Sequence, residues 1–366
     1  MTAATCPREE SSLGRVQDLL ADFFDEATAR ASSYGPHFER LWREAGRSVS
    51  GGKLVRPLLL LNAYDALTSE GARSRRPAAR GEAVERLAVA VELLHYAFLL
   101  HDDVIDGDLL RRGRPNLVGE ILGDCHRDVV DASRALHWAQ TCGILMGDLL
   151  LSASHQGFAR ADVPQAERLR LLDLLDLTIT DSVAGEQVDV GLSDGVVDPE
   201  LATILDMTTR KTATYTFELP LRMAAVLAGA PGGVERRLGR IGRHLGLAFQ
   251  LQDDLLCAFG DPELHGKDRY SDLREGKQTA IIAAARATPE WPRVEALLGE
   301  AARSEENAAT LSGLLAECGA QARVVELAER ELRSAGELIH APVGELPVGV
   351  RRVLLDLIGQ LRGRSS

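Results

Sequence analysis

The chain has 366 residues, of which 45% are apolar, and its 42 basic and 54 acidic residues give a formal charge of −12. This composition is typical of a soluble globular protein, and it argues against nucleic acid as a partner because binding to a phosphate backbone requires a concentrated basic surface. The N-terminus has acids where a signal peptide has an apolar run, and no run of 18 apolar residues follows. We therefore expect a cytoplasmic protein without stable membrane insertion.

The pattern along the chain is helical. Ala, Leu, Arg and Glu are abundant, aromatic residues make up 4%, and β-branched alternation is scarce, which predicts an all-α fold. The apolar periodicity predicts helices, some of them divided in two, at 12–33, 54–69, 82–105, 132–158, 163–190, 199–228, 233–259, 277–303, 304–340 and 347–362. Gly, Pro and charge predict loops at 71–82, 113–116, 190–199, 228–233 and 260–277.

No linker or fixed repeat separates these segments. Although the length also permits two domains, we expect one domain over residues 1–366, with 1–11 and 363–366 flexible. Asp131 or Ser133 is expected to cap the helix at 132–158, and Asp198 is expected to precede a helix with Pro199 at its first position. The loop at 260–277 has no predicted secondary structure. A loop of this length inside a compact domain more often has a functional role than none, so we expect it to be functional.

Five widely spaced cysteines without a CxxC pair indicate reduced thiols rather than a disulfide framework or a zinc site.

The first feature that points to chemistry is a cluster of acidic residues. The apolar run at 87–100 ends abruptly in HDDVIDGD at 101–108. In a helix Asp102 and Asp106 share one face, and Asp103 lies about 100° round. Acids at a helix C-terminus oppose the macrodipole, so they require a cationic partner unless they form a solvated helix end.

A second acidic pair follows another amphipathic helix, in AFQLQDDLLCAFGDP at 248–262. Magnesium ions take carboxylate ligands together with substrate phosphate oxygens, so two facing aspartate helices would hold a diphosphate.

Short cationic segments could contact the same anion. Each segment alone is weak evidence for a phosphate site, but together they would explain how an acidic protein binds phosphate. They are GGKLVRP at 51–57, RRGRP at 111–115, KT at 211–212 and GKDRYSDLREGK at 266–277.

Five motifs over about residues 50–280 resemble, in their order, those of the trans-isoprenyl (polyprenyl) diphosphate synthases, in particular geranylgeranyl diphosphate synthases. They are GGKLVRP, HYAFLLHDDVIDGDLLRRGRP, KT, FQLQDDLL and GKDRYSDLREGKQT. The resemblance implies a helical bundle of the isoprenoid synthase type around a central hydrophobic tunnel, and a homodimer. It implies a prenyltransferase that needs Mg²⁺, with three ions bound and Mn²⁺ as an alternative. The substrates would be isopentenyl diphosphate and an allylic diphosphate with a dimethylallyl, geranyl or farnesyl chain.

The same resemblance assigns roles to matching residues. Metal binding would fall to Asp102, Asp106 and Asp253, with Asp103 in support. Contacts to the allylic diphosphate or its metal shell would come from Arg111, Lys211, Thr212, Gln250, Lys267 and Lys277. Contacts to isopentenyl diphosphate would come from Lys53, Arg56, His95 and Arg112. For His95 a position in the core, and for Gln250 a helix-packing contact, are the alternatives.

One position departs from the family pattern, because Cys257 stands where many members have the third acid of the second motif. An active enzyme remains the main interpretation, and a non-catalytic partner subunit of another synthase is the alternative. A terpene cyclase shares the fold, but its usual late Asn/Ser/Glu metal motif is not seen in this sequence. For the dimer, the apolar segment near 130–155 is the candidate interface, and intramolecular core is the alternative.

Product length should depend on the side chains one turn before Asp102, since a helical turn rises 5.4 Å, close to one isoprene unit. Ala97 would let a chain pass and Phe98 would stop it, while Leu94 lies one turn deeper. The two signals conflict. We expect a C20 product, geranylgeranyl diphosphate, with C15 and C25 or longer products as alternatives.

Overall fold

The computed structural model describes residues 7–49, 52–69, 78–111, 113–128, 131–260, 270–342 and 346–363. Over these residues the chain is almost entirely helical, and the strands described are β1 (Leu110–Arg111) and β2 (Arg114–Pro115), which pair antiparallel. The prediction of an all-α fold is confirmed. The chain forms two compact units, the first from Met1–Asp65 and Ala72–Asp173 and the second from Ala66–Gly71 and Leu174–Ser366. The interpretation of residues 1–366 as one domain stays a prediction.

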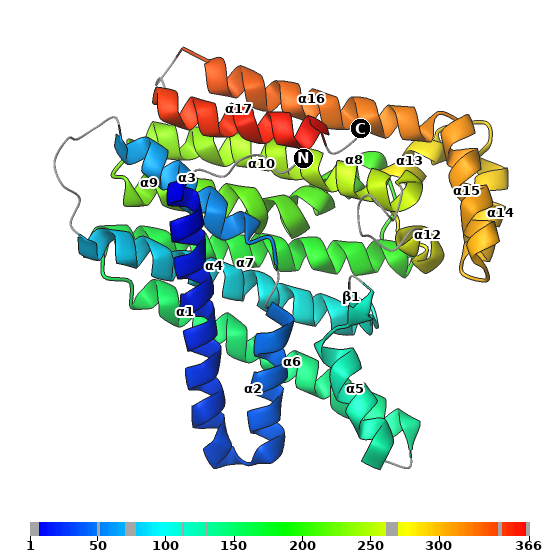
Figure 1. Cartoon of the computed structure of the whole chain (residues 1–366). Helices are drawn as coiled ribbons and strands as arrows, with labels where there is room; N and C mark the ends of the chain where they lie inside the picture. The colour runs from blue at the N-terminus through cyan, green and yellow to red at the C-terminus, as the bar shows by residue number, and fades with distance from the viewer. Residues whose placement is uncertain are drawn as a thin grey trace. The chain divides into compact units, whose positions relative to one another are not determined.

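The first unit contains α1 (Pro7–Ala31), the 3₁₀ turn η1 (Ser32–Tyr34), α2 (Pro36–Val49), α4 (Ala78–Ile105), α5 (Leu117–Asp128) and α6 (Ala132–Ala159). The chain passes between the units within α3 (Val55–Ser69) and within α7 (Gln165–Ser193). The second unit contains α8 (Leu201–Thr208), the π-helix η2 (Thr209–Glu218), α9 (Leu219–Leu227), α10 (Gly232–Phe259), α12 (Ser271–Glu275), α13 (Ala280–Arg286), α14 (Trp291–Ala301), α15 (Glu305–Glu317), α16 (Ala320–His340) and α17 (Val348–Arg362). Figure 1 labels the α-helices and β1.

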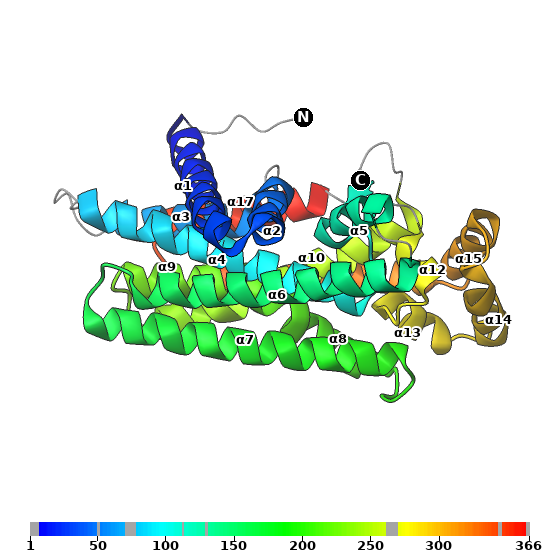
Figure 2. The ribbon, with the colours of Figure 1, turned by 90° about the horizontal axis from the view of Figure 1, so that it is seen from below.

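Small residues on α6 let it pack closely along α4 in the first unit (Figure 2). A Cβ atom added at Gly147 would lie 2.3 Å from Nε2 of His101, and one at Gly157 would lie 2.7 Å from Cβ of Ala90. The Ser154 hydroxyl donates a hydrogen bond to the Ala90 carbonyl at 2.8 Å. Because Gly147, Ser154 and Gly157 are seven and three positions apart, they form one stripe on α6, and the contact determines which face of α4 is turned away from α6.

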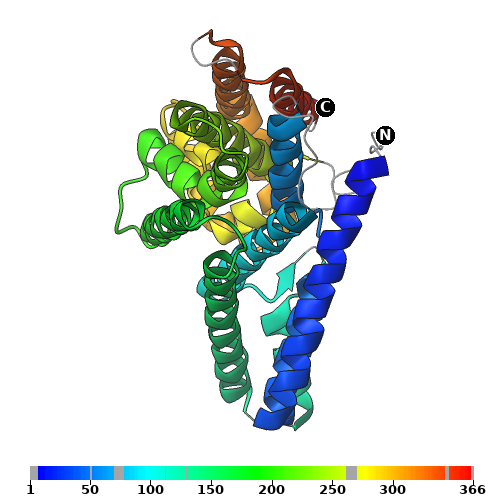
Figure 3. The ribbon, with the colours of Figure 1, turned by 90° about the vertical axis from the view of Figure 1, so that its left-hand side faces the viewer.

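Aromatic packing joins α1 and α2, which lie side by side in this unit (Figures 1 and 3). The ring of Trp42 lies 6.1 Å from that of Phe23 and 6.2 Å from that of Phe24, measured between centroids. Gly46 allows this approach, since a Cβ atom there would lie 3.0 Å from Cβ of Phe24. These contacts bury apolar rings, which contribute more to stability per residue than other side chains.

In the second unit α10 is the element against which η2, α9 and α16 pack. Figure 1 shows α16 and α17 running along it. Arg237 of α10 is buried and donates hydrogen bonds to three carbonyls at the end of α16, those of Leu338 at 2.6 Å, Ile339 at 3.2 Å and Ala341 at 2.7 Å. Carbonyls in a last helical turn have no partner within the helix, so this guanidinium caps α16 from a neighbouring helix.

Several expected boundaries are confirmed, notably α3, α6, α10 and α17, and the Asp131 side chain caps α6 by accepting the N–H of Ser133. The expected segments 277–303 and 304–340 each divide in two, as anticipated for some segments. Among the described helices, none is long and apolar enough to cross a membrane.

Other expectations are wrong. The N-cap of α8 is Glu200, so Asp198 and Pro199 lie before the helix rather than at its start. Helices α2 and α5 occupy segments where none was predicted, and α12 lies inside the loop expected to lack structure. The segment 199–228 is three consecutive helices, because η2 interrupts it, and β1 and β2 pair where only a loop was expected.

Replacing Arg237 by Ala should destabilise the second unit by about 2–4 kcal/mol, because three buried or part-buried charge-assisted hydrogen bonds are lost and the carbonyls keep no equivalent donor. The measurement is a fall in melting temperature by circular dichroism. The control is Arg240→Ala, three residues along the same helix, where the side chain is exposed. Equal melting temperatures for the two variants would show that Arg237 does not cap α16.

Candidate functional site

The first acidic motif lies at the C-terminal end of α4. The backbone N–H of Asp106 donates to the carbonyl of Asp102 at 2.8 Å, so the helical turn continues just past Ile105. One carboxylate oxygen of Asp102 lies within 4.8 Å of one carboxylate oxygen of Asp106. The two acids therefore share a face, as predicted, and they present hard oxygen donors of the kind that Mg²⁺ prefers. The donor set fits the ion that the resemblance implies.

Asp103 points in a different direction and is only 3% exposed. Its carboxylate accepts hydrogen bonds from Arg111, at 2.5 Å from Nη2 and 3.2 Å from Nε. Nη2 of Arg111 also lies 3.7 Å from Oδ2 of Asp102. Burial raises the pKa of the Asp103 carboxyl, and the positive charge of Arg111 acts against that shift. Asp103 is thus the counter-ion that holds Arg111 beside Asp102. This contact is a physical way in which Asp103 could have its expected supporting role.

The β1–β2 ribbon brings Arg111 back to the end of α4. The N–H of Asp108 donates to the carbonyl of Asp103 at 2.8 Å, and the N–H of Asn116 donates to that of Leu109 at 3.0 Å. The Asn116 amide donates to the Asp108 carbonyl at 2.8 Å and accepts the N–H of Gly119 at 2.9 Å. These hydrogen bonds give partners to backbone groups of the ribbon and to a backbone N–H in the first turn of α5. Arg112 lies outside the described residues.

The two candidate chain-length residues next to each other on α4 lie on different faces. Ala97 comes seven residues after Ala90 and four before His101, and both of those contact glycines of α6. Helical periodicity therefore places Ala97, which is fully buried, on the face packed against α6. Phe98 lies about one turn before Asp102, on a different face from Ala97, and is half-buried, and Leu94 is fully buried one turn deeper.

The residues expected to hold isopentenyl diphosphate belong to the first unit. Lys53 is exposed, Arg56 is buried in the first turn of α3, and His95 is half-buried on α4. Between the first two, Leu54 has φ +45° and is buried. A left-handed backbone at a leucine is strained, and such strain is found most often at binding sites. The structure thus adds an observation at GGKLVRP that the sequence pattern does not contain.

In the second unit Lys211 lies in η2 and contacts two acids of α7. Its Nζ donates to Oδ2 of Asp189 at 2.6 Å and lies 2.9 Å from Oε2 of Glu186. Gly185 makes this approach possible, because a Cβ atom there would lie 2.4 Å from the backbone nitrogen of Lys211. Sequence reasoning missed Glu186 and Asp189, although their spacing of three on a helix indicates a shared face.

The second acidic motif lies in the last two turns of α10. Asp253 is half-buried, and Gln250 donates to Oδ1 of the buried Asp254 at 2.8 Å. Cys257 follows one turn after Asp253 and is buried, with its Sγ 3.2 Å from the hydroxyl oxygen of Ser271. Burial raises the pKa of the Cys257 thiol to about 12, so at neutral pH the group is neutral and offers no thiolate ligand.

The remaining candidates are near the end of the loop at 260–277. Nζ of Lys277 lies 3.1 Å from Oε2 of Glu275, and its backbone N–H donates to the carbonyl of Asp272 at 3.0 Å. Thr212 is half-buried in η2. Lys267 lies outside the described residues. Ion pairs join Arg111 to Asp102 and Asp103 in the first unit and Lys211 to Glu186 and Asp189 in the second. The facing of Asp102 and Asp253, and the roles of the other candidates, stay predictions.

The polyprenyl synthetase family model matches residues 40–315, which is most of the chain. The chain therefore belongs to this family. It is a prenyltransferase, and Mg²⁺ dependence is general in the family. This result sets aside the terpene cyclase that shares the fold.

Two curated relatives are similar over most of their length. A geranylgeranyl diphosphate synthase from Methanosarcina mazei is 32% identical over 282 residues, which cover 76% of this chain and 76% of that protein. A (2E,6E)-farnesyl diphosphate synthase from Mycobacterium tuberculosis is 33% identical over 286 residues, which cover 75% and 70%. These polyprenyl synthetases are named for different products.

The fold is also that of a solved isoprenyl synthase. A geranylgeranyl pyrophosphate synthase from Corynebacterium glutamicum, in complex with isoprenyl diphosphate and magnesium, superimposes with a TM-score of 0.86 at 26% identity. The match covers 95% of this chain and 97% of that chain. The expected isoprenoid synthase fold is confirmed.

Replacing Asp103 by Asn should lower kcat/KM for prenyl transfer about 10- to 100-fold, because Arg111 loses the charge that holds it beside Asp102. Steady-state kinetics with radiolabelled isopentenyl diphosphate measure the change. The control is Asp124→Asn, which removes an ion pair with Arg40 elsewhere in the same unit and should leave kcat/KM unchanged. Equal losses in the two variants would mean that Asp103 acts only through stability.

Proposed function

We propose that this polyprenyl synthetase joins isopentenyl diphosphate head-to-tail (1′-4) to an allylic diphosphate and that its main product is the C20 geranylgeranyl diphosphate. The observation that carries the proposal is the pair Asp102 and Asp106 with Arg111 held beside it by Asp103. Two acids and one fixed cation at a helix end are suited to a diphosphate with its metal ions. The names of the two relatives support this reaction with C20 and C15 products.

The metal ligands in this proposal are Asp102, Asp106 and Asp253, with three Mg²⁺ ions bound and Mn²⁺ able to replace them. Bound Mg²⁺ would offset the negative charge that develops on the leaving diphosphate. The magnesium in the Corynebacterium glutamicum complex supports the choice of ion. Within the chain, Asp102 and Asp106 supply the oxygen donors, and their position on one face of α4 presents them to the same ligand.

The cationic residues would stabilise the leaving diphosphate as the allylic C–O bond breaks. Arg111 is oriented for this by Asp103, and Lys211 by the two acids of α7. Preorganised donors of this kind favour the transition state because they need not reorient as charge develops. The remaining contacts to this group are proposed for Thr212, Gln250, Lys267 and Lys277.

The second substrate would be held by Lys53, Arg56, His95 and Arg112, with its double bond near the allylic carbon. A new C–C bond forms as the allylic C–O bond breaks, and the resulting cation loses a proton to the released diphosphate. The developing cation requires apolar walls without nucleophilic water. Phe98 lies on the same face of α4 as Asp102, and an aromatic face contributes about 0.5–2 kcal/mol to holding a cation.

We also propose a homodimer through the exposed face of α6. Large apolar side chains on this helix are exposed in the single chain, namely those of Leu136, Trp138, Ile144 and Leu145. Exposed apolar groups on one helix are typical of an interface, and two-fold symmetry is the usual arrangement. Size-exclusion chromatography with light scattering measures the mass directly.

The purified chain alone should convert isopentenyl diphosphate and an allylic starter into organic-extractable radiolabelled product in the presence of Mg²⁺. Dimethylallyl, geranyl and farnesyl diphosphates are tested as separate starters, and the expected longest main product is C20. Chelation with EDTA should stop the reaction and excess Mg²⁺ should restore it. Product formed only after adding another synthase polypeptide would instead support the partner-subunit alternative.

Replacing Phe98 by Ala should lengthen the main product by at least one isoprene unit, because the side chain one turn below Asp102 no longer closes the path. Thin-layer or liquid chromatography of the dephosphorylated products measures the chain length. The control is Leu93→Ala, since Leu93 is a buried apolar residue of α4 that lies about 140° round the helix from Phe98. An unchanged product in the Phe98 variant would remove Phe98 from the floor of the tunnel.

A further inference from the structure

The element that carries Lys211 and Thr212 is a π-helix of ten residues, η2. A widened turn is visible where the backbone N–H of Leu219 donates to the carbonyl of Thr214, five residues earlier. The Thr214 side-chain hydroxyl also donates to the Thr209 carbonyl, at 3.0 Å. The π-helix is rare, and it usually occurs as a single turn within an α-helix. A longer one requires support from the surrounding structure.

Glycines on two neighbouring helices provide close backbone contact with η2. A Cβ atom at Gly185 of α7 would lie 2.4 Å from the backbone nitrogen of Lys211. On α10, a Cβ atom at Gly246 would lie 2.4 Å from Cβ of Ala213, and one at Gly242 would lie 2.7 Å from Cα of Glu218. With so little space between the helices, a shift at one end of η2 displaces the rest.

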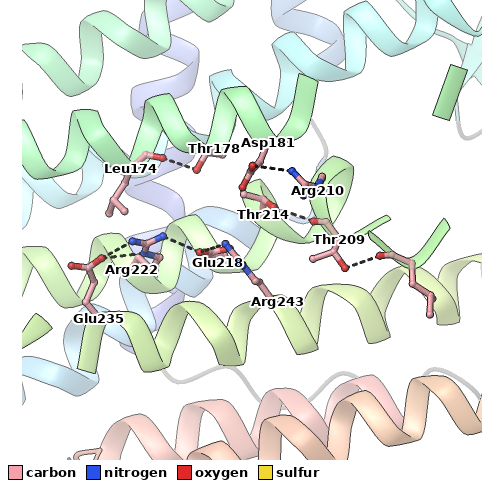
Figure 4. Close-up of polar contacts among 11 residues, drawn as sticks. Leu174, Thr178, Asp181, Thr209, Arg210, Thr214, Glu218, Arg222, Glu235 and Arg243 are labelled. Atoms are coloured by element: carbon pink, nitrogen blue, oxygen red, sulfur yellow. Dashed lines mark hydrogen bonds and ion pairs between the residues drawn. The ribbon is translucent and has the colours of Figure 1, made fainter. Parts of the chain in front are cut away.

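Ion pairs tie both ends of η2 to its neighbours (Figure 4). At the first end, Arg210 lies 2.8 Å from Asp206 of α8 and 3.6 Å from Asp181 of α7. At the last residue, the carboxylate of Glu218 lies 2.9 Å from Nη1 of Arg222 and 2.5 Å from Nε of Arg243. Glu218 is 4% exposed, so its charge depends on these two guanidinium groups.

Near the C-terminal end of η2, side-chain packing against α7 does not replace these ion pairs. A small pocket separates Thr178 and Asp181 of α7 from Thr214 and Glu218 of η2, and Arg243 forms part of its wall. Figure 4 shows the Arg222 and Arg243 side chains reaching Glu218 beside this gap. Where neighbouring side chains do not fill the space, charge-assisted hydrogen bonds determine the position of the helix end.

We propose that Glu218 is a positioning residue for prenyl transfer, which fixes the C-terminal end of η2 through Arg222 and Arg243 and thereby fixes the position of Lys211. This inference rests on the proposed function, in which Lys211 contacts the allylic diphosphate. Loss of the Glu218 charge removes its ion pairs with Arg222 and Arg243 and lets the C-terminal end of η2 move toward the pocket. Lys211 then moves away from the position set by Glu186 and Asp189.

The chain contains a matched control. Glu235 of α10 is also buried and also pairs with Arg222, at 2.9 Å from Nη2, but it is not part of η2. Glu218→Gln and Glu235→Gln each remove one carboxylate charge from the same arginine. Both variants should lose thermal stability, so stability alone cannot produce a difference between them.

The expected result is that Glu218→Gln lowers kcat/KM for the allylic diphosphate about 10- to 100-fold, as a small displacement of a catalytic group does. The KM for isopentenyl diphosphate should stay unchanged, because none of its proposed contacts belongs to η2. Glu235→Gln should keep the kinetic constants of the unmodified enzyme. An equal loss in the two variants, or wild-type kinetics in Glu218→Gln, would overturn the inference.

A double-mutant cycle with Lys211→Ala separates this inference from the proposed function. If Glu218 acts through Lys211, Glu218→Gln has no further effect on kcat/KM in the Lys211→Ala background. A full additional loss in that background would overturn the positioning role. If Lys211→Ala alone left the allylic kinetics unchanged, the proposed contact of Lys211 with diphosphate would be wrong. If Lys211→Ala is impaired and Glu218→Gln is not, only the positioning role fails.

Discussion

The ion pair between the buried Asp103 and the half-buried Arg111 is the interaction on which the first acidic motif depends. A carboxylate that is almost completely desolvated requires a cation and hydrogen bonds, and Arg111 supplies both. With Asp103 turned inward, helical periodicity leaves Asp102 and Asp106 together on a neighbouring face. The same contact fastens the β1–β2 ribbon to the end of α4. One buried carboxylate therefore directs both the acids and the cation of the site.

In the second unit as well, the degree of burial separates charged side chains that fix the structure from charged side chains that a ligand can reach. Glu218 is buried between two arginines, so its contacts are costly to exchange and suit a structural task. The Lys211 side chain is 21% exposed, and its contacts with Glu186 and Asp189 are less desolvated. Partly solvated ion pairs are worth less and exchange more easily. An anionic ligand can therefore compete for Lys211 without removing the support of the helix that carries it.

The parts of the fold that depend on local pattern were predictable from the sequence. Apolar periodicity located α4, α6 and α10, and helix geometry alone placed Asp102 with Asp106. The parts that depend on tertiary contacts were not. A π-helix at 209–218 has no local signature, because it forms where glycines of α7 and α10 admit a wider backbone. Which of Ala97 and Phe98 faces α6 could not be predicted either, since this depends on the side of α4 that α6 covers.

The environment of Cys257 explains why this chain can lack the third acid of its second motif. The thiol packs against Ser271, and the nearby charge of Asp272 adds to the effect of burial in keeping it protonated. A carboxylate at 257 would be buried next to the negative charge of Asp272, which is unfavourable unless a cation joins them. A neutral thiol avoids this repulsion and lets α12 pack against the end of α10. The motif then retains Asp253, one turn earlier, as an acid that is half-buried rather than buried.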